Sequence, residues 1–344
     1  ELNQGSFKNV KLKNGPNLIN GAVYNIKFDG LDRAGNSALE TNVENVTFDN
    51  EPPQVSISQP LDSEQIKSTV VSFISNEDLG KGFVIYKQTS GTADINSPHR
   101  IPIKSSNLTS GVHSDIDLGI TSQLADGGRY EVSIEAFDKA GNKAIASSIS
   151  DVFFDILPPN LTLTEPVNGS FVNSVKISYG TSEEMKKGTI TFSRVNGSED
   201  PNSPHIIELN KEQLKSGDHF SEQFDEVVNL KDGSIYRIDF SGEDLAGNIA
   251  KNILINNVTF DTSSPELSIL TPPSNGFYSN ISMAIEINEL LLSGEIIFEQ
   301  KGGTNDPLSP HKIELNSDQL KIGKHSSINI NSLTTLTSNA VYNI

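Results

Sequence analysis

The chain has 344 residues, of which 26 are Lys or Arg and 44 are Asp or Glu, so its formal net charge at pH 7 is −18. This charge argues against nucleic acid as a partner, because phosphates attract basic residues, and against anionic membrane surfaces. The sequence has no Cys, which excludes disulfide bonds and thiol catalysis. It also has no apolar run long enough for membrane insertion.

A period of 106 residues runs through the sequence, marked by tyrosines at positions 24, 130, 236 and 342. Three further sets of residues recur with the same spacing. They are Asp32, Asp138 and Asp244; Asp49, Asp155 and Asp261; and Pro53, Pro159 and Pro265. A unit of this length matches the commonest domain size and is longer than a solenoid repeat. We therefore expect each unit to fold around its own core.

The frame of this repeat predicts four units along the chain. We expect the C-terminal part of one unit at 1–49, complete units at 50–155 and 156–261, and a unit lacking its last strand or strands at 262–344. Because both ends fall inside a unit, we expect the parent protein to continue in both directions. The alternative is that the last unit is completed by the N-terminal strands of a neighbouring copy.

The first complete unit is expected to be a series of short strands separated by turn residues. Before it, strands are expected at 21–28 and 43–48. Within it, strands are expected at 55–58, 69–75, 82–88, 100–104, 113–118, 129–137 and 145–154. The segment 129–137 alternates apolar and polar residues with a period of two, which predicts a strand with one buried face.

The second complete unit repeats this plan, and only residues 183–187 look helical, for one turn at most. Seven short strands per unit, with frequent turn signals and no long helical period, predict an antiparallel β-sandwich. The fold class is therefore predicted to be all-β, with about seven strands in each 106-residue repeat.

A five-residue corner follows the alternating strand in three copies. The sequence Asp-x-Ala-Gly-Asn occurs at 32–36, 138–142 and 244–248, and each copy precedes a Phe-Asp…Pro linker. This pattern resembles the immunoglobulin-like (Ig-like) repeat of large bacterial surface proteins and adhesins. The resemblance implies tandem Ig-like sandwiches in an extracellular or cell-surface chain that acts as a stalk, spacer or adhesive fibre, with neighbouring repeats as its first partners.

Acidic residues recur where the linker, the second-strand loop and the corner should meet at one pole of each sandwich. They are candidate ligands for Ca²⁺, which prefers carboxylate and carbonyl oxygens. The candidate metal ligands are Asp49, Glu77 and Asp138 in the first unit, Asp155, Glu183 and Asp244 in the second, and Asp261 and Glu289 in the last. The competing interpretation is that the corner Asp only caps a turn and the Glu is solvated.

The six histidines fall at two positions of the repeat, one after Ser-Pro and one after Gly-x. A zinc site with Asp94, Asp200 or Asp306 is conceivable, but a structural or surface role fits better, since Phe7 replaces the second histidine in the partial first unit. No Gly-x-Ser-x-Gly motif appears, and no Lys recurs in every copy as a Lys–Asn crosslink would need. We expect no enzymatic activity. Asn-x-Ser/Thr sequons lie at Asn45, Asn107, Asn160, Asn168, Asn196, Asn257 and Asn280.

The leading function is therefore structural, with sandwiches and proline-stiffened linkers forming a semi-rigid rod. One alternative is an adhesive module that presents the loop after the third strand, at 89–99, 194–205 and 300–311, to a cell-surface glycan or another partner. Another is a surface-layer lattice built from copies of this chain. The absence of Trp disfavours a sugar-binding platform.

Overall fold

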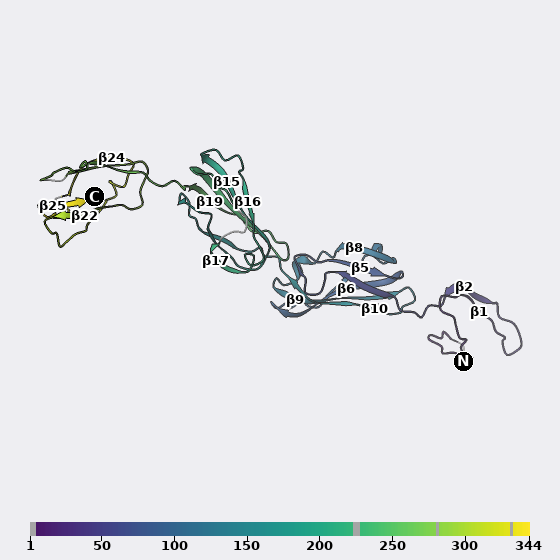
Figure 1. Cartoon of the computed structure of the whole chain (residues 1–344). Helices are drawn as coiled ribbons and strands as arrows, with labels where there is room; N and C mark the ends of the chain where they lie inside the picture. Colours follow the sequence, from purple (N-terminus) through teal and green to yellow (C-terminus); the bar gives the residue numbers. More distant parts are fainter. Residues whose placement is uncertain (1–4, 223–227, 280–281, 331–332) are drawn as a thin grey trace. The chain divides into compact units, whose positions relative to one another are not determined.

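The computed structural model describes residues 5–222, 228–279, 282–330 and 333–344. The sequon residue Asn280 lies outside these ranges. The chain divides into two compact units, Glu1–Thr259 and Phe260–Ile344. The described residues are all-β and form tandem Ig-like sandwiches (Figure 1). Short 3₁₀ helices, η1 (Ser105–Asn107) and η2 (Thr121–Gln123), lie in loops of the first complete sandwich.

The first segment of Glu1–Thr259 is a two-stranded antiparallel hairpin of β1 (Val23–Phe28) and β2 (Thr41–Thr47). A bulge places Asn45 at φ 59, in the left-handed region that Asn tolerates better than most residues. Asp32 occupies the corner between the two strands.

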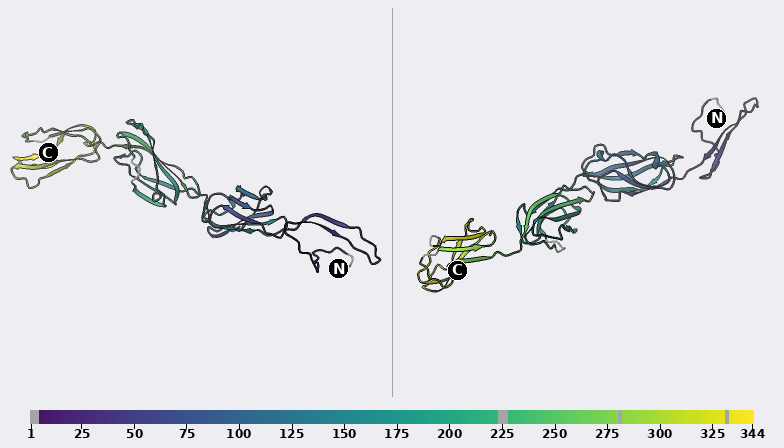
Figure 2. Two further views of the ribbon diagram at one scale, coloured as in Figure 1. Left: turned by 45° about the vertical axis from the view of Figure 1, so that its right-hand side comes forward. Right: turned by 90° about the horizontal axis from the view of Figure 1, so that it is seen from above.

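The sandwich that follows has two sheets, which can be traced in Figure 2. One sheet has the order β10-β3-β5-β8, with bounds Ile145–Ala146, Gln54–Gln59, Val70–Ser75 and Gly111–Asp117. The other has the order β4-β11-β9-β6-β7, with bounds Gln65–Ile66, Ser148–Phe154, Gly128–Asp138, Leu79–Gly91 and His99–Pro102.

The alternating strand is β9, and every second residue from Gly128 to Asp138 is buried. Tyr130 and Val132 are fully buried on this face, and they pack in one hydrophobic core with Phe73, Val84 and residues of both sheets. The period of two in the sequence therefore describes the packing directly, because successive side chains of a strand point to opposite faces.

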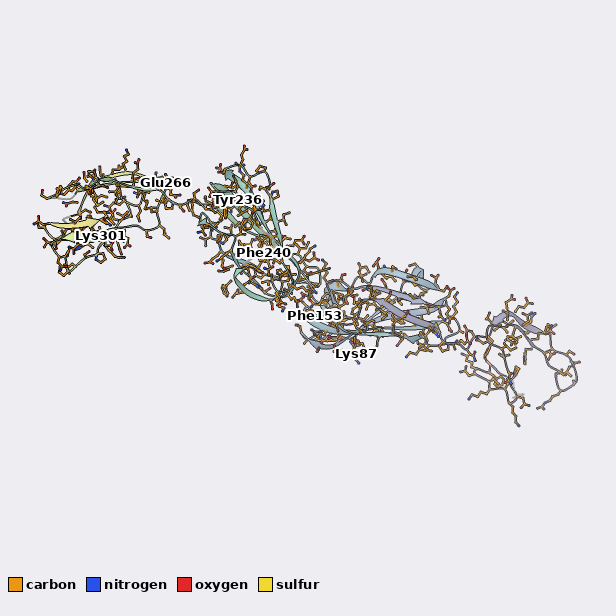
Figure 3. The ribbon with its side chains drawn as sticks, in the orientation of Figure 1. Lys87, Phe153, Tyr236, Phe240, Glu266 and Lys301 are labelled. Carbon is orange, nitrogen blue, oxygen red and sulfur yellow. The ribbon has the colours of Figure 1, made fainter. Side chains whose placement is uncertain are left out.

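The next sandwich repeats this arrangement. One sheet is β12-β14-β17, with bounds Leu161–Glu165, Ile177–Thr181 and Gly217–Glu222. The other is β13-β19-β18-β15-β16, with bounds Phe171–Val172, Ile253–Phe260, Ser234–Asp244, Met185–Gly197 and His205–Glu208. Tyr236 and Phe240, both labelled in Figure 3, are fully buried on one face of β18.

The helical turn expected at 183–187 is wrong, because β15 already begins at Met185 and pairs with the end of β18 at Asp244. Lys187 continues this ladder, opposite Glu243. Tertiary pairing overrides the local helix preference of this segment.

The unit Phe260–Ile344 contains two three-stranded sheets around a core that includes Met283 and Phe298. Their orders are β20-β21-β24, with bounds Leu267–Thr271, Ser282–Ile287 and Gly323–Asn329, and β23-β22-β25, with bounds His311–Glu314, Glu295–Gly303 and Ala340–Asn343. Strand β25 takes the place that β9 and β18 hold beside the long strand in the other sandwiches.

The alternating strand starts with the same tyrosine contact in four copies. The Tyr130 hydroxyl accepts a hydrogen bond from the backbone N–H of Ala125, five residues upstream, at 2.8 Å. The other three tyrosines accept from the residue five positions before them, in the pairs Tyr24 with Ile19, Tyr236 with Lys231 and Tyr342 with Thr337. A tyrosine that bonds back to the upstream backbone at this strand is a hallmark of Ig-like sandwiches.

Candidate functional site

The corner after β9 is organised by the carboxylate of Asp138. Its Oδ1 accepts hydrogen bonds from the backbone N–H groups of Gly141 at 2.6 Å and Asn142 at 2.8 Å. Its Oδ2 accepts from Nδ2 of Asn142 at 2.7 Å. Gly141 has φ 98, which a residue without Cβ adopts at little cost. Burial alone would raise the pKa of Asp138, but these hydrogen bonds favour the ionised form and lower it overall.

The corner also holds the linker that enters the sandwich. Nδ2 of Asn142 donates to the backbone carbonyl of Asp49 at 3.1 Å, across 93 residues of sequence. In the next repeat, Nδ2 of Asn248 donates to the carbonyl of Asp155 at 2.9 Å. One asparagine therefore closes the corner and fixes the preceding linker in both complete repeats.

A glutamate follows the second long strand of each sandwich, in the turn between β5 and β6 or between β14 and β15. The Ser75 hydroxyl donates to the backbone carbonyl of Glu77 at 2.7 Å, and the Thr181 hydroxyl donates to that of Glu183 at 2.9 Å. These bonds hold the backbone of each glutamate beside the strand end. This turn is the second-strand loop that the sequence predicts at the pole where the linker arrives.

The structure brings these carboxylates together in both complete repeats. Each residue of a set contributes one carboxylate oxygen, and within a set these oxygens all lie within 4.8 Å of one another. The two sets, here called the junction clusters, are Asp49, Glu77 and Asp138, and Asp155, Glu183 and Asp244.

The third predicted set is smaller and forms no such group of three among the described residues. Asp261 Oδ1 accepts from the backbone N–H of Ser263 at 3.1 Å, as the other linker aspartates do two residues downstream. Glu289 has a buried carboxylate oxygen, Oε1, without a hydrogen-bond partner. The corner position equivalent to Asp138 and Asp244 would follow Ile344, the last residue of the sequence given, so this set is represented here by Asp261 and Glu289 alone.

Mutual repulsion and burial raise the pKa values of several carboxyl groups in the junction clusters. Burial raises the pKa of Glu183 to about 7, with further contributions from the charges of Asp155 and Asp244. Burial, followed by the charge of Asp49, also raises the pKa of Glu77. The pKa of Asp155 is raised as well, chiefly by burial. Close carboxylates therefore share protons or need a cation to be fully ionised together.

A second constellation is a buried Asp–His–Tyr cluster, whose Asp and His the sequence suggested only as conceivable zinc ligands and whose Tyr it did not include. Nε2 of His99 lies 2.6 Å from Oδ2 of Asp94, and the Tyr130 hydroxyl donates to the same oxygen at 2.8 Å. Because an ionised carboxylate only accepts, Nε2 of His99 carries the hydrogen. The side chains of Asp94 and His99 are only 3% and 6% exposed.

The same cluster occurs in all three later repeats, as Asp94, His99 and Tyr130; Asp200, His205 and Tyr236; and Asp306, His311 and Tyr342. Burial opposes ionisation of Asp94, but bonds from His99 and Tyr130 hold its pKa below the ordinary value. The sequence shows that these Asp, His and Tyr residues recur with the 106-residue period. It does not show that the side chains of the His and the Tyr both bind the carboxylate of the Asp.

The second group of histidines lies elsewhere. His113 sits on β8, in the opposite sheet from β7, and its Nε2 contacts the backbone carbonyl of Thr109 at 2.7 Å. His219 and His325 make the same contact with the residue four positions upstream. The histidines therefore have structural hydrogen bonds, and the two groups do not combine into one zinc site.

Comparison with known proteins gives similarities of fold alone. No protein-family model matches the sequence, and no curated protein matches it. Among solved structures, the fibronectin(III)-like modules of Clostridium thermocellum CbhA match at 12% identity and TM-score 0.34, covering 60% of this chain and 94% of theirs. The FN1–FN3 domains of chicken CNTN1 match at 15% identity and TM-score 0.29, covering 68% of this chain and 78% of theirs.

At this level of similarity, neither match indicates a ligand, an activity or a location for this chain. No helix among the described residues is long and apolar enough to cross a membrane.

Proposed function

We propose that this chain is a non-enzymatic structural segment of a large extracellular or cell-surface protein, in which tandem Ig-like sandwiches act as a semi-rigid stalk, spacer or fibre. Each complete repeat has its own two sheets, so it can bear load without its neighbours. The resemblance to the repeats of bacterial adhesins supports the surface location. The acidic surface keeps such a chain soluble.

The observation that carries this proposal is the bond between corner and linker. Asn142 and Asn248 each tie the linker backbone to the sandwich that follows, at 3.1 Å and 2.9 Å. A linker fixed at one end retains fewer orientations than a free linker, and its prolines restrict it further. A flexible tether would need neither feature.

The proposal includes Ca²⁺ as the cofactor that stiffens the two junction clusters. Ca²⁺ binds oxygen ligands at 2.3–2.6 Å, so two ligands on opposite sides of one ion lie about 4.6–5.2 Å apart. The spacing of at most 4.8 Å within each cluster fits this requirement. Carboxylates and nearby turn carbonyls are the hard ligands that this ion prefers.

The junction clusters suit weak binding in a calcium-rich environment. Extracellular sites of this kind have dissociation constants of about 0.1–1 mM. At about tenfold excess over the dissociation constant, one site adds about 1.4 kcal/mol to the stability of the folded state. The neutralised carboxylates would then hold linker, turn and corner in one arrangement.

Thermal melting of the whole chain with Ca²⁺, with Mg²⁺ and with a chelator tests the cofactor. We expect Ca²⁺ to raise the melting temperature, and we expect the double variant Glu77→Gln, Glu183→Gln to lose most of this shift. Glu199→Gln, at an exposed position outside both clusters, is the matched control and should keep it. An unchanged melting temperature in Ca²⁺ would exclude Ca²⁺ as a cofactor, and the rod would then consist of protein alone.

Small-angle scattering of the whole chain tests the rod itself. We expect an elongated particle, and we expect Asn142→Ala with Asn248→Ala to broaden its distribution of dimensions, because the linkers lose their anchor. Identical scattering from wild type and variant would contradict the proposed role of the corner.

A second candidate function is adhesion through the loop after β6 and its equivalents. The Asp–His–Tyr cluster ties Asp94, within this loop, to His99 at the start of β7 and to Tyr130 on β9, while Ile95 in the first copy is 92% exposed. A loop already held in one conformation loses less conformational entropy when it binds a partner. A glycan array probed with the whole chain distinguishes this function, because a stalk predicts no specific hit.

A further inference from the structure

Five Asn-Gly steps occur in the chain, at Asn14, Asn20, Asn168, Asn196 and Asn275. Such steps are chemically labile, since glycine has no side chain to shield its backbone nitrogen from the preceding asparagine side chain. Whether a given step reacts in the folded protein depends on where the asparagine side chain is held. The structure separates three of these steps, at Asn20, Asn168 and Asn196, on that criterion.

The side chain of Asn196 is folded over its own peptide bond. The backbone N–H of Gly197 donates to Oδ1 of Asn196 at 2.9 Å, so this nitrogen lies next to Cγ, the carbon bonded to Oδ1. This hydrogen bond keeps the side-chain amide beside the nitrogen that would attack it, so less reorientation is needed before the reaction. Asn196 is exposed to solvent, so water and base can reach it.

A positive charge lies beside this step. The guanidinium of Arg194 donates to the backbone carbonyl of Gly197 through Nη2 and to that of Ser198 through Nε, both at 2.7 Å. A nearby cation favours loss of a proton from a neighbouring amide nitrogen. The equivalent residues in the other repeats are neutral, Gln88 and Gln300, and they precede Ser90-Gly91 and Gly302-Gly303.

Two other Asn-Gly steps are held in a different way. Oδ1 of Asn20 accepts from the backbone N–H of Asn50 at 2.9 Å, and Oδ1 of Asn168 accepts from that of Asn256 at 2.7 Å. Both side chains are therefore bound to a distant segment. To react, each would first have to give up this hydrogen bond.

We propose that Asn196 is a site of spontaneous modification, at which the side-chain amide is converted to a carboxylate without an enzyme. Base removes the proton from the Gly197 nitrogen, and the nitrogen attacks Cγ of Asn196. The protonated base then returns a proton to Nδ2 as the Cγ–Nδ2 bond breaks, so that ammonia leaves. The resulting succinimide ring then takes up one water molecule. Opening at one carbonyl yields aspartate, and opening at the other yields isoaspartate.

The isoaspartate product would disturb the end of the β15–β18 ladder. Asn196 pairs with Ile235 and Gly197 with Ser234, and the backbone of Gly197 packs directly against the carbonyl of Gly233. Isoaspartate inserts an extra methylene into the backbone at this tight contact. The loop that follows carries Asp200 of the Asp–His–Tyr cluster, so its anchoring would weaken with age.

The test is a time course of the whole recombinant chain at mildly alkaline pH, followed by tryptic peptide mapping with fragment-ion localisation. Conversion adds about 1 Da to the modified residue. Asn196 should convert faster than Asn20 and Asn168 in the folded chain. A parallel time course in urea should bring the three rates together, with Asn20 and Asn168 each accelerated about fivefold by loss of one hydrogen bond.

The variant Asn196→Ser, which carries the residue found at the equivalent Ser90, controls for reaction elsewhere in the same peptide and should show no conversion at this position. Hydrogen exchange of residues 198–204 should rise with the fraction of modified wild-type chain and stay constant in the variant. A folded chain in which Asn196 converts no faster than Asn20 or Asn168 would overturn the proposal.

Discussion

Two tyrosine hydroxyls in the same core have opposite surroundings. The Tyr130 hydroxyl donates to Asp94 and accepts from the N–H of Ala125, both at 2.8 Å. The Tyr86 hydroxyl is buried without a hydrogen-bond partner, although its ring meets that of Tyr130 edge-on at 6.2 Å. The cost of burying the Tyr86 hydroxyl is therefore not offset.

This contrast gives a matched pair of substitutions. Tyr130→Phe should destabilise the chain by about 1–3 kcal/mol, because Asp94 and the N–H of Ala125 each lose a partner. Tyr86→Phe should leave stability unchanged or raise it, as the other repeats carry Phe192 and Phe298 at this position. Urea unfolding of both variants measures the difference. Equal losses of stability would contradict the assigned hydrogen bonds.

The raised pKa of Glu183 predicts a pH dependence. A carboxyl whose pKa is about 7 in the folded state, against an ordinary value of 4.5, binds its proton more tightly when folded. Its contribution to stability is therefore fully present below about pH 4.5 and is lost as the pH rises through about 7. Asp155, whose pKa is also raised, acts in the same direction.

In chelator, the melting temperature of wild type should therefore fall between about pH 5 and pH 8, and Glu183→Gln should reduce this fall. Calorimetry at several pH values measures both slopes. In Ca²⁺ the wild-type slope should flatten, since the cation replaces the proton. A Glu183→Gln chain with the wild-type slope would show that another group is responsible.

At the scale of the element, the last strand of the hairpin and of both complete sandwiches has a residue in the left-handed region. A bulge between β9 and β11 places Asp151 at φ 57, and the equivalent positions hold Asn45 at φ 59 and Asn257 at φ 57. Asn and Asp tolerate this conformation, whereas a β-branched residue does not. The bulge therefore coincides with an Asn or Asp at one fixed position of the repeat.

Asp151→Val should therefore be less stable than Asp151→Gly by about 1–2 kcal/mol. Both variants lose the exposed ion pair between Asp151 and Arg129, so comparing them with each other removes that contribution. Chemical denaturation provides the measurement. If the two variants unfolded at the same denaturant concentration, the bulge would not depend on the left-handed residue.

The strands differ in how well they could be predicted. The sequence indicated β5 and β9 almost residue for residue, because both carry strong local patterns. It missed β4, which has only two residues and exists through parallel pairing with β11, nearly 90 residues away. It also placed the end of β6 three residues early, because the pairing of Ser90 and Gly91 with β9 is not visible in the local sequence.

At the scale of the whole molecule, the repeats differ in how complete their junction clusters are. The two complete repeats each bring three carboxylates together, whereas the last repeat supplies Asp261 and Glu289 without a corner aspartate. Among the described residues, a cation that needs all three ligands should therefore act at the two junction clusters.

Hydrogen exchange with and without Ca²⁺ should show this selectivity. Protection should increase at residues 76–80, 138–142, 182–185 and 244–248, and should stay unchanged at 287–291. The unaffected segment serves as the control within the same molecule. Equal protection at 287–291 would show that the corner aspartate is dispensable, and the proposed ligand set would then be wrong.

The sequence by itself determined the repeat, its period, the all-β class and the residues of the corner, because these follow from local spacing and turn chemistry. It also identified the acidic residues that form the junction clusters. Only the tertiary structure decided that Asp94, His99 and Tyr130 meet at one carboxylate, and that the hydroxyl of Tyr86 has no partner. Such contacts depend on how separate strands are placed in three dimensions, which local sequence patterns do not encode.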